Sequence, residues 1–288
     1  MKILIIGASG FIGSHLANRL LEKGQHEVYA VSRKKIVNTS SSLHSIPCDV
    51  AESNFTSFLP TGIDCVIHLA QSDQYKNFPE GVDDIFAVNI RATQLLLEWC
   101  RKNEVKKFIY ASSGNVYQRQ NKLLTETDVC EPIEYYGASK YAAEQLVKQY
   151  KQFFHTCILR IFGVYGPSQK NMTIPNIIER VLNGQEVTLA KGSGLYFTPL
   201  FISDCVEMMV CTIEKENKNS LYNLAGNERI HLGQLVDLIS KFVKKTPVTK
   251  LTEGEEMYLT GSATLFNEDH QYNPAITIEE GLKKILHT

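Results

Sequence analysis

Short apolar runs recur along the first part of the chain, each followed by a longer segment of mixed character. The runs are KILIIG (2–7), EVYAVS (27–32), DCVIHLA (64–70), KFIYASS (107–113) and TCILRIF (156–162). Unbroken apolar runs of this length are typical of strands that are buried on both faces of a parallel sheet. We therefore predict an α/β fold, a Rossmann-type doubly wound parallel sheet whose strands are joined by covering helices.

The intervening segments carry apolar residues at helical spacing. The first helix is predicted over residues 11–24, where Gly24 is suited to end it. Two longer helices are predicted over 84–103 and 136–153. The polar stretch 33–45, after the second strand, is predicted to be a loop.

The alternation loosens beyond residue 166. Further helices are predicted near 175–183, 203–214, 231–243 and 278–286, with a short strand in LYNLAG (221–226). We expect a doubly wound domain over residues 1–166 and a smaller C-terminal α/β substrate lobe over 167–288. Segments around 200–225 are expected to return to the first domain.

Composition and charge narrow the classes of function. The chain has 288 residues, of which 43% are hydrophobic, and a net charge of −1. The absence of a basic stripe argues against nucleic acid as the main partner. There is no apolar run of about 18 residues and no signal-peptide pattern, so a protein without a membrane span is expected. Seven cysteines without a C-x-x-C pair predict buried thiols and a cytoplasmic location.

The segment GASGFIG lies between a predicted strand and a predicted helix. Gly7 suits a tight turn, Gly10 lets the backbone approach a pyrophosphate, and Gly13 lets the helix pack closely on the strand. The N–H groups at the start of the helix, at Phe11 and Ile12, would face the phosphates. The spacing is G-x-x-G-x-x-G, and we interpret it as a binding site for a nicotinamide dinucleotide.

The end of the second predicted strand bears on the choice of dinucleotide. An NAD site usually has an acidic residue here that binds the ribose 2′-hydroxyl. This chain has Ser32, Arg33 and Lys34 instead. A hydroxyl and a guanidinium are suited to a 2′-phosphate, which arginine can bind with two hydrogen bonds. We therefore expect NADP(H) in preference to NAD(H).

Six motifs occur in the order found in extended short-chain dehydrogenases/reductases: GASGFIG, CDV (48–50), HLA (68–70), ASSGNVY (111–117), YGASK (136–140) and LRIFGVYGP (159–167). The chain resembles, more narrowly, the NAD-dependent epimerase/dehydratase family that acts on nucleotide sugars. The resemblance is strong to residue 167 and weaker beyond it. It implies an enzyme with a nicotinamide cofactor, no metal, a nucleotide-sugar substrate and a homodimer built through the two long helices.

The resemblance also implies further cofactor contacts. Asp49 would bind the adenine, Leu69 and Ala70 would line the cofactor, and Asn89 matches a position that supports the active site. The remaining positions expected at the cofactor are Val50, Gln71, Ser112, Ile161 and Phe162.

The family motif Tyr-x-x-x-Lys matches Tyr136 and Lys140, whereas Tyr135 has Ser139 at the same spacing. Residues four apart on a helix share a face. A lysine ammonium and an oxidised nicotinamide would favour the phenolate and lower the tyrosine pKa from about 10. Tyr136 would then exchange a proton with the substrate and Lys140 would hold the nicotinamide ribose. Ser113 matches the family hydroxyl that bonds the same substrate oxygen.

The residues after Ser113 limit the reaction. Family members that remove water, or a carboxyl group, have acidic residues there, whereas Gly114 and Asn115 cannot transfer a proton. We expect a 4-ketoreductase of a (deoxy)sugar nucleotide, with hydride from NADPH, as Arg33 suggests, and Tyr136 as the proton donor. The alternative is a nucleotide-sugar 4-epimerase that retains NAD.

The second lobe departs from the family pattern. Phe197 and Thr198 replace the arginine and aspartate of the family's R-D-[FY] element, and a second arginine expected within 253–258 is missing. A non-sugar carbonyl substrate, and a non-catalytic NADP(H)-binding sensor or interaction module, therefore stay open. Candidate substrate contacts are Ser113, Asn115, Tyr136, Lys170 and Tyr196.

Overall fold

The computed structural model describes residues 1–37 and 40–287. Contacts divide the chain into two compact units. Unit 1 comprises Met1–Gln118, Val129–Arg160 and Val206–Tyr222, and unit 2 comprises Arg119–Asp128, Ile161–Cys205 and Asn223–Thr288. The segment 119–128 thus joins unit 2, although it lies within the first domain expected from the sequence.

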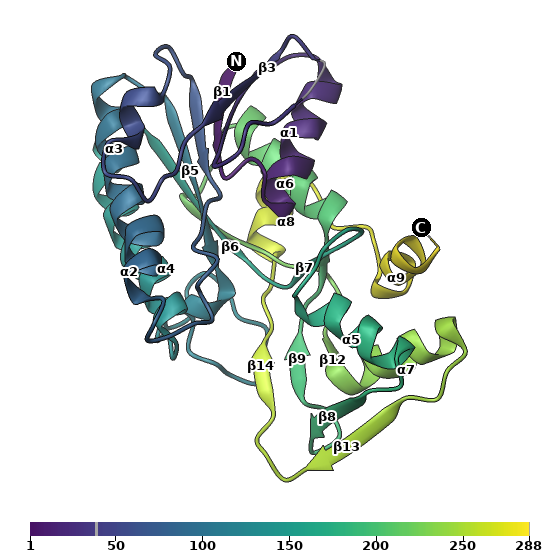
Figure 1. Ribbon diagram of the computed structural model, residues 1–288. Coiled ribbons are helices and arrows are strands. Elements are labelled where there is room, and N and C mark those ends of the chain that lie inside the picture. Colours follow the sequence, from purple (N-terminus) through teal and green to yellow (C-terminus); the bar gives the residue numbers. More distant parts are fainter. Residues whose placement is uncertain (38–39, 288) are drawn as a thin grey trace. The chain divides into compact units, whose positions relative to one another are not determined.

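Unit 1 holds most of a seven-stranded sheet with the order β11-β6-β5-β4-β1-β2-β3 (Figure 1). Its strands are β1 Lys2–Ile6, β2 Glu27–Ser32, β3 Leu43–Pro47, β4 Cys65–His68, β5 Lys107–Ser113, β6 His155–Ile161 and β11 Leu221–Leu224. β1 pairs in parallel with β2 on one side and with β4 on the other. The strand order therefore reverses beside β1, where doubly wound sheets bind their ligands at the carboxyl ends of the strands. The predicted fold class is confirmed.

β3 lies partly within the stretch that was expected to be a loop. It pairs in parallel with β2, from Val28 opposite Leu43 to Ser32 opposite Pro47. None of its five residues, LHSIP, is fully buried. An edge strand has a neighbour on only one side, so it lacks the long apolar run by which buried strands are recognised. The expectation of a loop is therefore wrong for residues 43–45, whereas residues 33–37 and 40–42 contain no helix or strand, and residues 38–39 lie outside the described residues.

Helices cover both faces of the sheet. The helical elements of this region are α1 Phe11–Lys23, η1 Phe55–Phe58, α2 Val82–Ile85, the π-helical turn η2 Phe86–Arg91, α3 Ala92–Lys102, η3 Gly114–Val116, α4 Tyr135–Gln149, η4 Tyr150–Gln152 and α6 Ile202–Glu214. α2, α3 and α4 lie along one face, and α1 and α6 along the other (Figure 1). α1 ends at Gly24, whose φ of 67° is left-handed, as the sequence predicted. Leu96, Leu97 and Phe108 are completely buried in the core.

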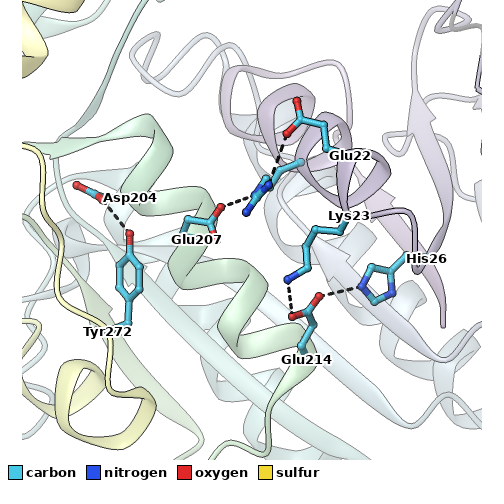
Figure 2. A network of polar contacts seen from close by, with 8 residues as sticks. Glu22, Lys23, His26, Asp204, Glu207, Glu214 and Tyr272 are labelled. Carbon is cyan, nitrogen blue, oxygen red and sulfur yellow. Dashed lines mark hydrogen bonds and ion pairs between the residues drawn. The ribbon is translucent and has the colours of Figure 1, made fainter.

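Charged side chains join α1 to α6 on the second face (Figure 2). Arg19 pairs with Glu207, and Lys23 Nζ lies 2.9 Å from Glu214 Oε2. His26 Nε2 lies 3.0 Å from the other oxygen of Glu214. Burial raises the pKa of Glu214, but its hydrogen bonds with Lys23 and His26 outweigh burial and lower that pKa below its usual value. The contacts therefore favour an ionised carboxylate at this crossing.

Unit 2 contains short strands and helices. They are β7 Val164–Tyr165, α5 Thr173–Leu182, β8 Glu186–Ala190, β9 Leu195–Phe197, β10 Leu200–Phe201, β12 Ile230–His231, α7 Leu232–Val243, β13 Val248–Thr252, β14 Met257–Leu259, α8 Thr264–His270 and α9 Ile278–Leu286. The strands form small sheets in the orders β10-β7, β12-β9-β14 and β13-β8. Asp204 at the start of α6 accepts a hydrogen bond from Tyr272 at 2.8 Å (Figure 2). The short helix α8 was not predicted.

The described residues contain neither a membrane-spanning helix nor a cluster of metal-binding side chains. Over 1–37 and 40–287, no helix combines the length and the apolar character needed to cross a bilayer. Within the same ranges, no three His, Cys, Asp or Glu side chains gather in an arrangement that could hold a metal ion. All seven cysteines are free thiols, and Cys65, Cys100, Cys157 and Cys205 are buried.

Candidate active site

The glycine turn between β1 and α1 is packed against neighbours on both sides. Gly7 has a φ of 89°, and a Cβ atom on it would lie 2.8 Å from the Ala70 nitrogen. A Cβ atom on Gly13 would lie 2.3 Å from the Gly7 carbonyl oxygen. The N–H groups of Gly7 and Ala8 donate to the Val31 carbonyl at 3.1 and 3.0 Å. The turn therefore lies between the ends of β2 and β4, and only glycine fits at these two positions.

The start of α1 is open to an anion. The helix begins at Phe11. The residue before it, Gly10, has no side chain that could cap the first N–H groups. Its first turn, which includes Ile12, has no acidic residue. The first N–H groups of a helix have no intrahelical partner, and the helix dipole favours negative charge there. These features fit the diphosphate of a dinucleotide.

The residues after β2 have partners of their own. The Ser32 side chain is buried, and its hydroxyl donates to the Lys34 carbonyl at 2.6 Å. Arg33 Nη1 donates to Asp73 Oδ2 at 3.2 Å, and both of these side chains are exposed. The hydroxyl and the guanidinium that were expected to receive a 2′-phosphate are therefore bound to other groups.

Most of the other expected cofactor positions lie at the same edge of the sheet. Asp49 is exposed, and its Oδ1 accepts a hydrogen bond from the Ala51 nitrogen at 2.9 Å. Leu69 and Ala70 follow β4 and are partly buried. Val50 is buried in the apolar core of unit 1. Ile161 and Phe162 belong to unit 2, where the Phe162 ring packs against Gly261.

Tyr136 lies in the first turn of α4, and its hydroxyl donates to Gln71 Oε1 at 2.9 Å. Its side chain is 9% exposed. Burial raises the pKa of Tyr136 to about 12, although the Ser113 hydroxyl acts in the opposite direction. In the protein alone, burial therefore favours the neutral phenol, and the lowering of this pKa by a bound oxidised nicotinamide stays a prediction. Tyr135 stacks on Phe78 with ring centroids 5.2 Å apart, as a packing residue would.

Ser113 ends β5 and lies at the start of η3. Its Oγ accepts hydrogen bonds from the backbone nitrogen of Asn115 at 3.2 Å and from the Asn115 side chain at 3.3 Å. Ser113 is buried and Asn115 is half-buried. Asn115 therefore fixes the position of the Ser113 hydroxyl, and this hydroxyl acts to lower the pKa of Tyr136.

Lys140 lies one helical turn after Tyr136 and is 2% exposed. Its Nζ lies 4.8 Å from the centroid of the Tyr110 ring. Burial lowers the pKa of Lys140 to about 7, and the negative charge of Glu144 opposes this effect. Both protonation states of this lysine are therefore accessible near neutral pH.

A buried ion pair that we did not predict joins Arg160 to Glu144, which lies one helical turn after Lys140 in α4. Ser112 Oγ donates to Glu144 Oε1 at 2.5 Å. Arg160 donates from Nε to the same oxygen at 2.9 Å and from Nη2 to Oε2 at 2.7 Å. The sequence held a signal, because a lone arginine inside the apolar run TCILRIF needs a buried partner.

Asn89 lies in the π-helical turn η2 and is completely buried. Its Nδ2 donates to Ser139 Oγ at 2.9 Å, and its Oδ1 accepts from the Ser72 nitrogen at 3.1 Å. Asn89 thus connects α4 to the segment after β4 by hydrogen bonds. It acts on the site through Ser139 and Ser72. π-Helical turns of this kind are frequent at functional sites.

The substrate candidates in the second lobe belong to unit 2. Lys170 is exposed, and Tyr196 stacks on Tyr258 with ring centroids 5.2 Å apart. Phe197 and Thr198, which replace the family's charged pair, are 4% and 1% exposed. Within unit 2 these two positions are therefore interior positions that offer no charge to a ligand.

Curated relatives match most of the chain. An uncharacterized UDP-glucose epimerase of Bacillus subtilis (strain 168), YtcB, is 29% identical over 303 residues, which cover 98% of this chain and 96% of the relative. A dTDP-D-glucose 4,6-dehydratase of Dictyostelium discoideum is 31% identical over 258 residues, which cover 80% of this chain and 59% of that protein.

Solved structures have the same fold. The UDP-glucuronic acid 4-epimerase of Bacillus cereus, in complex with UDP-glucuronic acid and NAD, has a TM-score of 0.87 at 26% identity, with 99% of this chain and 97% of that chain covered. MoeE5, in complex with UDP-glucuronic acid and NAD, has a TM-score of 0.87 at 27% identity, with 100% and 98% covered.

These structures contain NAD, so the expected preference for NADP(H) is wrong. The guanidinium of Arg33, which suggested a 2′-phosphate ligand, is instead paired with the carboxylate of Asp73. The profile of the family described as "NAD dependent epimerase/dehydratase family" matches residues 3–225. The chain therefore belongs to the NAD-dependent epimerase/dehydratase family.

Proposed function

We propose that this chain is an NAD-dependent nucleotide-sugar epimerase that inverts carbon 4 of the sugar. The observation that carries the proposal is the arrangement of Tyr136, Ser113 and Lys140 in unit 1, at the carboxyl edge of a sheet whose glycine turn fits a dinucleotide. The relatives named above act on, or are bound to, UDP or dTDP sugars, and this supports the same class of substrate here.

In this proposal Tyr136 is the group that moves the proton. Its phenolate oxygen would take the proton of the sugar hydroxyl at carbon 4 and return it after inversion, while Ser113 orients that sugar oxygen. Bound NAD would supply a reversible acceptor for the hydride of that carbon. Tyr136 is a neutral phenol in the protein alone, so positive charge on Lys140 and on the oxidised nicotinamide would favour its phenolate form.

The residues support a dehydratase and a 4-ketoreductase less well than an epimerase. A dehydratase uses carboxylates directly after the serine, and this chain has Gly114 and Asn115 there. The preference for a 4-ketoreductase rested on NADPH, which is no longer expected. An epimerase needs one retained NAD and one proton-transferring residue, and these requirements match the residues of unit 1.

The test is turnover of a panel of UDP-glucose, UDP-glucuronic acid and dTDP-glucose with NAD present. We expect a carbon-4 epimer, identified by NMR, without net change in NAD. Tyr136→Phe should lower the rate by about 10²- to 10⁴-fold, the usual worth of a positioned acid–base group. Tyr135→Phe, which changes the neighbouring packing residue, should leave the rate nearly unchanged.

Other outcomes would replace the proposal. Stoichiometric oxidation of NADH by a 4-keto sugar nucleotide would select the ketoreductase, and a 4-keto-6-deoxy product would select the dehydratase. Tight NAD binding without turnover of any substrate would favour a binding module. We also propose a cytoplasmic homodimer, because the family resemblance implies one. Sedimentation as a monomer at micromolar concentration would exclude the dimer.

A further inference from the structure

An ion pair joins the segments that follow β2 and β4 in unit 1. Arg33 comes directly after β2, Asp73 lies shortly after β4, and Arg33 Nη1 lies 3.2 Å from Asp73 Oδ2. These two strands are the neighbours of β1 in the sheet. The glycine turn packs between their ends, with Gly7 bonded to Val31 on one side and against Ala70 on the other. The pair therefore connects the two sides of the candidate dinucleotide site.

The pair changes the charge that the end of β2 offers to a ligand. Hydrogen bonds from Gln74 and from Arg33 hold the pKa of Asp73 below its usual value, so its carboxylate is ionised at neutral pH. The carboxylate offsets the charge of Arg33, and the Ser32 hydroxyl already donates to the Lys34 carbonyl. A 2′-phosphate would therefore meet a neutralised guanidinium and a nearby negative charge.

We propose that Asp73 confers the preference for NAD over NADP, in place of the acidic residue that NAD sites usually have at the end of the second strand. The inference rests on the use of NAD in the proposed function. Asp73 acts in two ways: it occupies the guanidinium of Arg33, and it repels a phosphate on the ribose 2′-oxygen.

The position of the pair makes this proposal testable without unfolding the protein. The side chains of Arg33 and Asp73 are 67% and 59% exposed. Exposed ion pairs contribute little to stability, so loss of this one should leave the fold intact. Once Asp73 is neutral, Arg33 and Lys34 are free to attract a 2′-phosphate.

The experiment is a titration with NADH and with NADPH in the absence of sugar, followed by nicotinamide fluorescence. Four proteins are compared: the wild type, Asp73→Asn, Asp83→Asn, and the double variant Asp73→Asn with Arg33→Gln. Asp83 is an exposed aspartate in α2, so it serves as the matched control for the loss of one negative charge. Where NAD co-purifies with the protein, displacement of bound NAD by added NADP replaces the titration.

We expect the wild type to bind NADH at least about tenfold more tightly than NADPH. Asp73→Asn should lower this ratio by about fivefold or more, through tighter binding of NADPH, and the double variant should lose that gain. Asp83→Asn should keep the wild-type ratio.

An unchanged ratio in Asp73→Asn, or a wild type that binds NADPH as tightly as NADH, would overturn the inference. Epimerisation of the sugar panel is measured separately. A shifted ratio without epimerisation would leave the inference standing and remove the proposed function. Epimerisation with an unshifted ratio would remove the inference alone, and binding of neither dinucleotide by folded protein would remove both.

Discussion

Arg160 donates two hydrogen bonds to the carboxylate of Glu144 in the interior of unit 1, at 2.9 and 2.7 Å. The two side chains are 2% and 0% exposed. The pair joins β6 to α4 one helical turn beyond Lys140, and Ser112 donates to the same carboxylate. A buried charge that loses its partner is costly, whereas removal of both charges together is often tolerated.

We therefore expect Glu144→Leu to lower the free energy of unfolding by about 3–5 kcal/mol, because Arg160 is left without its counter-charge. The double variant Glu144→Leu with Arg160→Met should recover part of this loss. Urea unfolding of the single and double variants measures both values. If the double variant is as unstable as the sum of the two single variants, the pair is not energetically coupled.

Lys140 should make the free energy of unfolding rise with pH above neutrality. Burial lowers its pKa to about 7, whereas an unfolded lysine has a pKa near 10.4. Between these values the unfolded state binds more protons, so the free energy of unfolding rises with pH. For the cofactor-free protein the gain from about pH 7 to about pH 9 is on the order of 2 kcal/mol.

Lys140→Met should lack this gain, and Lys151→Met, at an exposed site, should keep it. Urea unfolding at several pH values measures the difference. The same gain in Lys140→Met as in the wild type would show that the buried amine does not titrate in this range.

His68 should make the folded protein less stable at acidic pH. It is completely buried, its Nε2 lies 3.1 Å from Thr93 Oγ1, and burial together with the charge of Lys140 lowers its pKa to about 3. An unfolded histidine has a pKa near 6.5. Stability from this group is therefore present above about pH 6.5 and is lost as the pH falls toward about 3.

We expect His68→Gln to flatten the pH dependence of the unfolding free energy between about pH 6 and about pH 4, by about 1.4 kcal/mol per pH unit. Thermal or urea unfolding across this range provides the measurement. His155→Gln changes an exposed histidine and should leave the slope unchanged. Equal slopes in all three proteins would contradict the assignment.

Gly137 should be intolerant of a side chain. A Cβ atom there would lie 2.3 Å from the Asn115 carbonyl oxygen and 3.0 Å from Pro132 Cβ. Gly137→Ala would push α4 away from the segment after β5, which holds Ser113 close to Tyr136.

We expect this substitution to cost about 1–3 kcal/mol of stability and to lower the epimerisation rate. Gly254→Ala is the control, because the nearest atoms to its Cβ would lie at 3.6 and 3.7 Å. Thermal unfolding and the turnover assay report the two effects. Wild-type behaviour of Gly137→Ala would mean that α4 can shift without cost.

The sequence by itself determined the doubly wound sheet, most of its helices and the spacing of Tyr136 and Lys140. Strand and helix patterns repeat over a few residues, so they can be read locally. The edge strand β3 and the short helix α8 were not predicted, because their local patterns of apolar and polar residues are weak. Gly24 and the glycine turn could be predicted because a backbone conformation selects glycine directly.

The tertiary structure decided what each side chain faces. Arg33 alone suggested a phosphate ligand, but its partner Asp73 lies 40 positions away in the chain. The sequence placed Lys140 one turn from Tyr136, but only the structure shows that Tyr136 is buried and that burial raises its pKa to about 12 in the protein alone. Charge and pKa depend on burial and on the nearest opposite charge. Those are set by which distant segments meet, and local sequence patterns carry no information about that.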